Sequence, residues 1–245
     1  TLFRHPSRFA NGNTLAPDGS LLTCEHGTRR ISRTAPDGTY SIVCDSHDGK
    51  RLNSPNDLVV DKDGSIWFSD PTYGIISDAE GHRAESEQAA NAVYRIAGGS
   101  GEVSVEIMDL KMPNGLCFSP DGRTLYVADS GADMGPEIDF DEDGPRDILA
   151  YPVGADGRVA GPGRLLARAS RGVPDGMRCD DLGYLWVATG AGAECFTPEG
   201  ERIGAISTPE TLANLAFGGS DGNEMLFTLA SRIYLITLPR GGPAE

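Results

Sequence analysis

The sequence predicts an all-β protein, and within that class a six-bladed β-propeller, from one repeated motif and the hairpin patterns around it. Five times an Asn or Asp stands eight residues ahead of a turn glycine and opens a short apolar run, and a strand-like run follows each turn. A motif repeated in register marks equivalent places in equivalent structural units. The pairs are Asn11 with Gly19, Asn56 with Gly64, Asn114 with Gly122, Asp175 with Gly183, and Asn214 with Gly222.

Each unit is expected to contain two hairpins. Residues 58–69 and 116–128 alternate or run apolar on both sides of an Asp-Gly turn, which is a strong hairpin signal. Second hairpins with their own glycine turns are expected at 29–44, 91–108, 148–159 and 194–207. Four strands per unit indicate propeller blades, because sandwiches have similar turns but do not repeat one motif in register five times.

Five blades are visible in this pattern, and we expect a sixth. Residues 2–10 read as the outer part of a blade, so the N-terminal blade is expected to be incomplete in this chain. The polar segments 73–91 and 131–147 are expected to form loops over one mouth of the central channel. Residues 1–245 are expected to form a single propeller domain.

Composition narrows the classes of partner. The formal net charge of −15 would repel phosphates, which argues against nucleic acid and anionic membranes and suits a neutral or cationic ligand. No apolar run approaches the roughly 18 residues that a membrane span needs. The five cysteines are an odd number without a CxxC motif, which favours free thiols and a cytoplasmic location, with the periplasm as the alternative if a leader has been lost. The oligomeric state is left open.

Three of the repeated residues form the sharpest candidate site. Asn56, Asn114 and Asp175 each follow a proline, which shapes the turn before any ligand binds. Amide and carboxylate oxygens suit Ca²⁺ or Mg²⁺, whereas zinc prefers His and Cys. One such turn alone is more often structural, but three in register favour a metal site.

Other polar residues leave two readings open. Glu25, Asp70, Asp129 and Thr189 close the next strand of their repeats. They either have a functional role, supporting the ligands or touching substrate, or simply begin the next loop. His26 is either a proton shuttle or a satisfied polar residue near the pocket rim. Residues 139–144 spell DxDxDG, the opening of a calcium loop, but Ala150 stands where its glutamate is expected, which favours a solvated acidic loop.

The segments NSPNDLVVDKDGSIWFSDPTYGI, MPNGLCFSPDGRTLYVADS and GVPDGMRCDDLGYLWVA resemble the gluconolactonase and senescence-marker-protein (regucalcin) family. ANGNTL and CEHG are similar to its bacterial gluconolactonase branch, and diisopropyl fluorophosphatase is a more distant resemblance. The resemblance implies a six-bladed propeller with one divalent cation on its axis, usually Ca²⁺, with Mg²⁺ or Zn²⁺ as alternatives. It implies that Asn114 and Asp175 are metal ligands, that Asp175 is also the general acid/base, and that Asn56 binds the metal or the substrate.

The sequence departs from the family pattern at two places. It does not contain the Glu-Gly-Pro motif that supplies a further ligand, which puts metal affinity in question. Ser54 stands where some animal relatives carry a substrate-binding Arg, which argues against assuming their substrate. The expected function is metal-dependent hydrolysis of a small sugar lactone such as gluconolactone. The alternatives are hydrolysis of a phosphotriester or another ester at the same site, and a non-catalytic ligand-binding propeller.

Overall fold

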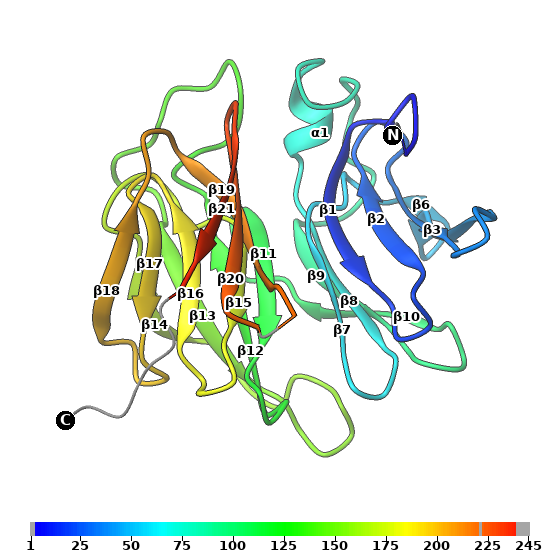
Figure 1. Ribbon diagram of the computed structural model, residues 1–245. Coiled ribbons are helices and arrows are strands. Elements are labelled where there is room, and N and C mark those ends of the chain that lie inside the picture. The colour runs from blue at the N-terminus through cyan, green and yellow to red at the C-terminus, as the bar shows by residue number, and fades with distance from the viewer. Residues whose placement is uncertain (1–2, 221, 239–245) are drawn as a thin grey trace.

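Five antiparallel sheets follow one another along the chain in the computed structural model, which describes residues 3–220 and 222–238 (Figure 1). Within every sheet the strands pair in sequence order. The first sheet holds β1 (Ala10–Leu15), β2 (Leu21–Glu25), β3 (Arg30–Thr34) and β4 (Tyr40–Cys44). The second holds β7 (Leu58–Val60), β8 (Ile66–Asp70), β9 (Ala92–Ile96) and β10 (Val103–Ile107).

The third sheet holds β11 (Pro113–Phe118), β12 (Thr124–Asp129), β13 (Asp147–Pro152) and β14 (Arg164–Arg168). The fourth holds β15 (Met177–Cys179), β16 (Leu185–Thr189), β17 (Gly192–Phe196) and β18 (Arg202–Ser207), and the fifth holds β19 (Leu212–Gly218), β20 (Glu224–Leu229) and β21 (Ile233–Thr237). A small ribbon of β5 (Ser46–His47) and β6 (Lys50–Arg51) projects between the first two sheets in sequence. These sheets are the blades of a β-propeller.

The repeated Asn or Asp lies at or just before the first strand of each sheet, as the motif predicts. These first strands are the inner ones, since β1 contacts β7, β7 contacts β11, β11 contacts β15 and β15 contacts β19. The turn glycines all take the left-handed conformation that favours glycine in a tight turn. Their φ values are 81° at Gly19, 80° at Gly64, 77° at Gly122, 88° at Gly183 and 68° at Gly222.

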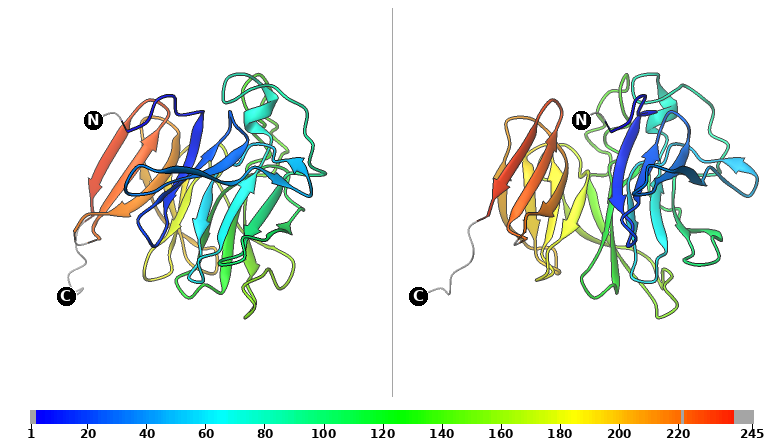
Figure 2. Two further views of the ribbon diagram at one scale, coloured as in Figure 1. Left: turned by 90° about the vertical axis from the view of Figure 1, so that its right-hand side faces the viewer. Right: turned by 45° about the vertical axis from the view of Figure 1, so that its right-hand side comes forward.

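Apolar layers between neighbouring sheets hold the row together. Leu22 and Ile31 of the first sheet pack with Phe68 and Tyr94 of the second, and Trp67 packs with residues of the third. Similar layers join the third sheet to the fourth and the fourth to the fifth. Four layers for five sheets describe an arc, and within the described residues no comparably extensive strand contact joins the first sheet to the fifth (Figure 2).

The N-terminal segment differs from the prediction, which assigned residues 2–10 to the outer part of an incomplete sixth blade. The first sheet has all four strands, and the sheet with three described strands is the fifth. Residues 3–9 form no strand, and positive φ values at Arg8 (61°) and Phe9 (54°) are incompatible with one. Instead, the Arg4 and Arg8 guanidinium groups lie over the Tyr40 ring and beside the buried Glu25. The expected sixth blade is not among the described residues.

The two polar insertions lie on the same face of the propeller, at the top of Figure 1. The first begins with α1 (Tyr73–Ile76), and the second connects β12 to β13 (Figures 1 and 2). The Tyr73 hydroxyl donates to the Asp133 carbonyl at 3.0 Å, and Arg83 pairs with Glu137 at 3.0 Å, so the insertions meet each other. No helix in the described ranges is long and apolar enough to cross a bilayer.

Candidate active site

A cavity of about 570 Å³ opens where the inner strands begin and the two insertions meet. Asn56, Asn114 and Asp175 all line it, so the three residues singled out from the sequence come together in space. Asn11 and Asn214, the other members of the repeat, line it too. Tyr73, Glu80, Asp133 and Glu137 reach it from the insertions, as expected for loops over the mouth of the channel.

Asn114 is the buried member with a free acceptor. It lies at the start of β11, is 6% exposed, and its Oδ1 has no hydrogen-bond partner. The segment before it is fixed by Asp129, whose carboxylate accepts hydrogen bonds from the backbone amides of Lys111 and Met112, each at 2.9 Å. A buried carbonyl oxygen without a donor costs free energy unless a ligand or water satisfies it. This oxygen is therefore a candidate ligand for a cation.

Asn56 is positioned in an equivalent way by the preceding repeat. The Asp70 carboxylate accepts from the backbone amide of Asn53 at 2.7 Å, and the Ser54 hydroxyl donates to the Pro71 carbonyl at 2.6 Å. The backbone amide of Asn56 itself donates to Ser69 at 2.9 Å. Burial raises the pKa of Asp70 to about 7, although the hydrogen bonds from the Asn53 and Ser54 amides and the nearby Arg29 oppose the rise.

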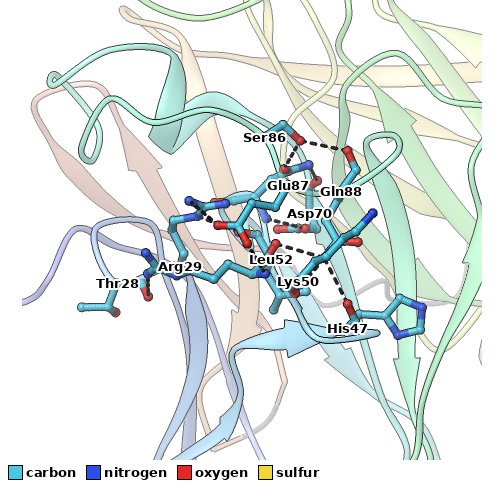
Figure 3. A network of polar contacts seen from close by, with 11 residues as sticks. Thr28, Arg29, His47, Lys50, Leu52, Asp70, Ser86, Glu87 and Gln88 are labelled. Atoms are coloured by element: carbon cyan, nitrogen blue, oxygen red, sulfur yellow. Dashed lines mark hydrogen bonds and ion pairs between the residues drawn. The ribbon is translucent and has the colours of Figure 1, made fainter.

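A polar network attaches the first insertion to this segment (Figure 3). Arg29 donates to the carbonyls of Leu52 and Asn53 at 2.7 and 3.1 Å and pairs with Glu87 at 3.6 Å. The Ser86 hydroxyl donates to the side-chain oxygen of Asn53 at 2.7 Å. The end of the loop that roofs the cavity is therefore tied to the residues just ahead of Asn56.

The residues that close the second strands do not line the cavity, and three of the four bond backbone groups. Asp70 and Asp129 position the segments before Asn56 and Asn114. They therefore support the candidate ligands indirectly, and they also begin the next loop, so both readings hold in part. Glu25 accepts from Thr28 and Ser32, and the Thr189 hydroxyl donates to the Gly192 carbonyl. Their place outside the cavity excludes direct contact with a molecule bound in it.

His26 is a buried connector near the rim. Its Nε2 lies 3.3 Å from Asn11 Nδ2 and its Nδ1 lies 3.2 Å from the Glu80 carbonyl, so the neutral ring accepts from Asn11 and donates to Glu80. Burial lowers the pKa of His26 to about 4. A ring that stays neutral and has both nitrogens occupied is the satisfied polar residue of the two readings.

Asp175 stands in a strongly perturbed environment within the cavity. Burial, followed by the charges of Asp57, Glu80 and Asp133, raises its pKa to about 8. A neighbouring cation would favour the carboxylate and lower this pKa again. A carboxylate whose pKa lies near neutral pH is suited to accept and return a proton.

Asp57 is the residue that the sequence reading missed. It is 2% exposed, lines the cavity, and burial raises its pKa, while Arg178 and hydrogen bonds from Leu58, Leu116 and Asn214 oppose the rise. A signal was present, because three of the other four repeats carry glycine at this position. An aspartate at a place that is glycine in most repeats marks a functional or packing exception.

The donor set of the cavity fits a hard cation. The described residues contain no group of three His, Cys, Asp or Glu side chains arranged to hold a metal. The unpartnered Asn114 Oδ1, the Asn56 amide and the Asp175 carboxylate are the oxygen types that Ca²⁺ prefers. The DxDxDG segment does not offer a second site, because Asp141 pairs with Lys111 at 3.0 Å and Ala150 lies in β13.

Comparison with known proteins identifies the family. The family model described as the SMP-30/Gluconolactonase/LRE-like region matches residues 2–231. A gluconolactonase from Zymomonas mobilis is 34% identical over 94% of this chain and 62% of its own length. The lactonohydrolase oryL of Aspergillus oryzae is 31% identical over 77% of this chain and 45% of its own.

A solved gluconolactonase structure from Xanthomonas campestris superposes with a TM-score of 0.87 at 34% identity, covering 98% of this chain and 75% of that one. The chain spans less than two thirds of the length of the two curated relatives, the Zymomonas mobilis gluconolactonase and oryL. The extent of the family match, together with the similarity to these relatives, shows that this chain belongs to the SMP-30/gluconolactonase/LRE-like family.

Proposed function

We propose that this protein is a metal-dependent lactonase that opens a small sugar lactone by hydrolysis. The observation that carries the proposal is the cavity at the inner strands, where a buried Asn114 oxygen without a partner faces the same space as Asp175 and Asn56. The similarity to a gluconolactonase and to a lactonohydrolase supports a lactone as the substrate class.

Asn56, Asn114 and Asp175 would hold a divalent cation, with Ca²⁺ as the first candidate. When bound, such a cation polarises a carbonyl oxygen and stabilises the negative charge that develops on it. Asp175 accepts a proton from the attacking water and returns one to the ring oxygen as the acyl C–O bond breaks. Asn56 orients the lactone, and the product is the open hydroxy acid.

The direct test follows acid release from glucono-1,5-lactone, corrected for spontaneous opening, with Ca²⁺ and with a chelator. Asp175→Asn should lower the rate by roughly 100-fold or more. The variant should keep the wild-type fold. Burial and neighbouring carboxylates raise the pKa of Asp175, which means that its negative charge does not stabilise the folded protein. Asp121→Asn, at an exposed turn, is the matched control. Full activity in the Asp175 variant would remove this residue from the mechanism.

Metal binding has its own readout. Calorimetric titration of Ca²⁺ should give a saturable heat in the wild type and a weaker one in Asn114→Ala. No saturable heat in the wild type, together with no lactone opening, would favour a non-catalytic propeller. Turnover of an organophosphate triester with no turnover of the lactone would move the proposal to the alternative ester substrate.

We also infer that the complete ring has six blades in one domain. The four apolar layers of the described sheets support this inference, as does the greater length of the relatives. Inner strand β1 is largely exposed, whereas its counterpart β11 is buried, and Leu15 of the first sheet and Leu235 of the fifth are 67% and 61% exposed. A structure of the full gene product in which the first and fifth sheets pack directly would contradict it.

We propose a cytoplasmic location because the cysteines are reduced thiols and form no disulfides. All five cysteines are free, and four of them are buried. Fractionation of the native host would test this location.

A further inference from the structure

We propose that this site selects uncharged lactones and rejects lactones that carry a phosphate, sulfonate or carboxylate group, because Glu80, Asp133 and Glu137 form an acidic wall at its mouth. The inference rests on the proposed lactonase function and adds the class of substrate. We call these three residues the acidic wall.

The charge of the cavity is one-sided. Its lining contains five carboxylates and, within the described part of the chain, no Lys, Arg or His. Two of the carboxylates, Asp57 and Asp175, lie at the inner strands, and the other three are the acidic wall. A divalent cation at Asn114 and Asp175 would offset only part of this charge, so an approaching anion would still meet a net negative field.

The acidic wall is supported by contacts between the two insertions. Glu80 comes from the first insertion, and Asp133 and Glu137 come from the second. The Tyr73 hydroxyl bonds the Asp133 carbonyl at 3.0 Å, and Gly135 stands so close to the Tyr73 ring that an added Cβ would lie 3.3 Å from it. The position of the carboxylates at the rim therefore follows from packing between the loops.

Arg83, a cation that pairs with the acidic wall, does not neutralise it. Arg83 pairs with Glu137 at 3.0 Å, but both side chains are about two-thirds exposed, at 64% and 66%, and Arg83 does not line the cavity. Solvent screens such a pair. The Asp133 carboxylate accepts from the backbone amide of Gly135 at 3.0 Å.

The carboxylates influence one another across the cavity. The Glu80 residue is exposed, yet partial burial of its carboxyl raises the pKa, and the charge of Asp133 adds to the rise. Both charges also reach Asp175, where they add to the effect of burial on its pKa. An anionic substituent on a bound lactone would enter this same field.

The test compares kcat/KM for glucono-1,5-lactone and for its 6-phosphate, which share one ring and differ in charge. The wild type should use the neutral lactone at least about tenfold better. Asp133→Asn, Glu80→Gln and Glu137→Gln should each raise the ratio of the phosphorylated to the neutral substrate by roughly three- to tenfold. Glu102→Gln, at an exposed turn outside the cavity, should leave the ratio unchanged.

Salt separates charge from shape. Raising the ionic strength from about 0.02 M to about 0.5 M should increase the ratio in the wild type and change it less in Asp133→Asn. A steric block would not respond to salt. Equal use of both lactones by the wild type would overturn the inference while leaving the lactonase proposal standing, and so would a ratio that neither salt nor the three variants change. No turnover of either lactone would overturn the lactonase proposal and this inference with it.

Discussion

The buried carboxylate of Asp70 should make the protein less stable as the pH rises through the mildly acidic range. Its pKa is about 7 in the folded protein against 3.8 for the free side chain. Between these values the folded protein holds a proton that the unfolded chain has lost. Raising the pH therefore favours unfolding, and the loss is complete once the pH exceeds the folded value.

The size of the effect follows from the shift. A difference of about three pKa units corresponds to roughly 4 kcal/mol in total, of which about 2 kcal/mol falls between pH 5 and pH 7. The side chain of the Asp70→Asn variant cannot ionise. Between pH 5 and pH 7 the free energy of unfolding of this variant should therefore fall by about 2 kcal/mol less than that of the wild type. The variant will carry a constant penalty as well, because the Asp70 Oδ1 position has no hydrogen-bond partner for an amide nitrogen.

Urea unfolding at a series of pH values from 5 to 7 measures the slope apart from that constant penalty. The other carboxylates with raised pKa values, such as Asp57 and Asp175, remain in both proteins, so the difference isolates Asp70. Asp121→Asn is the control, because hydrogen bonds from Ser119 and Arg123 lower the pKa of Asp121 and keep it ionised throughout this range in either state. An Asp70→Asn protein with the wild-type slope would refute the reasoning.

Three further predictions follow from contacts near the inner strands and from the thiols. Gly115→Ala should destabilise the protein by about 1–3 kcal/mol in urea unfolding, because its Cβ would lie 2.1 Å from the Asp175 carbonyl, whereas Gly204→Ala, with open space around it, should not. Asp129→Ala should lower the free energy of unfolding by about 3 kcal/mol and weaken Ca²⁺ binding, because three backbone amides lose their acceptor. Unchanged Ca²⁺ affinity would show that Asp129 has no positioning role. Cys179 should be the first thiol that a disulfide reagent labels in the native protein, since the other four cysteines are buried; early labelling of another cysteine, identified by peptide mapping, would count against this.

The repeat made the inner strands predictable. Every unit needs an Asn or Asp where the inner strand begins and a glycine in the turn that follows the strand. This constraint fixes the spacing, which places Asn56, Asn114 and Asp175 at equivalent positions. Equivalent positions in a ring of sheets lie around one axis, and these three residues do share one cavity. Their chemical roles depend on a bound cation and substrate and stay predictions.

The rest of the site could not be read in the same way, for two physical reasons. Glu80 and Asp133 lie in insertions without periodicity, where a carboxylate has the same sequence signature whether it faces the cavity or solvent. Residues 2–10 resemble a strand in composition, but the left-handed backbone at Arg8 and Phe9 and the contacts with Glu25 and Tyr40 decide their path. Those contacts are tertiary, and no local pattern encodes them.

Asp57 shows where a break in the repeat carries the most information. A Cβ at Gly12, Gly115 or Gly176 would come within 2.5 Å of the next sheet, so the inner strands of the first, third and fourth sheets approach their neighbours through glycine. The second sheet has Asp57 instead, whose carboxylate pairs with Arg178 of the fourth sheet at 3.9 Å. This carboxylate therefore joins two sheets and charges the cavity at once. Replacing it would disturb packing and chemistry together, so loss of activity in an Asp57 variant could not by itself assign a catalytic role, whereas Asp175, whose charge the fold does not need, can be tested cleanly.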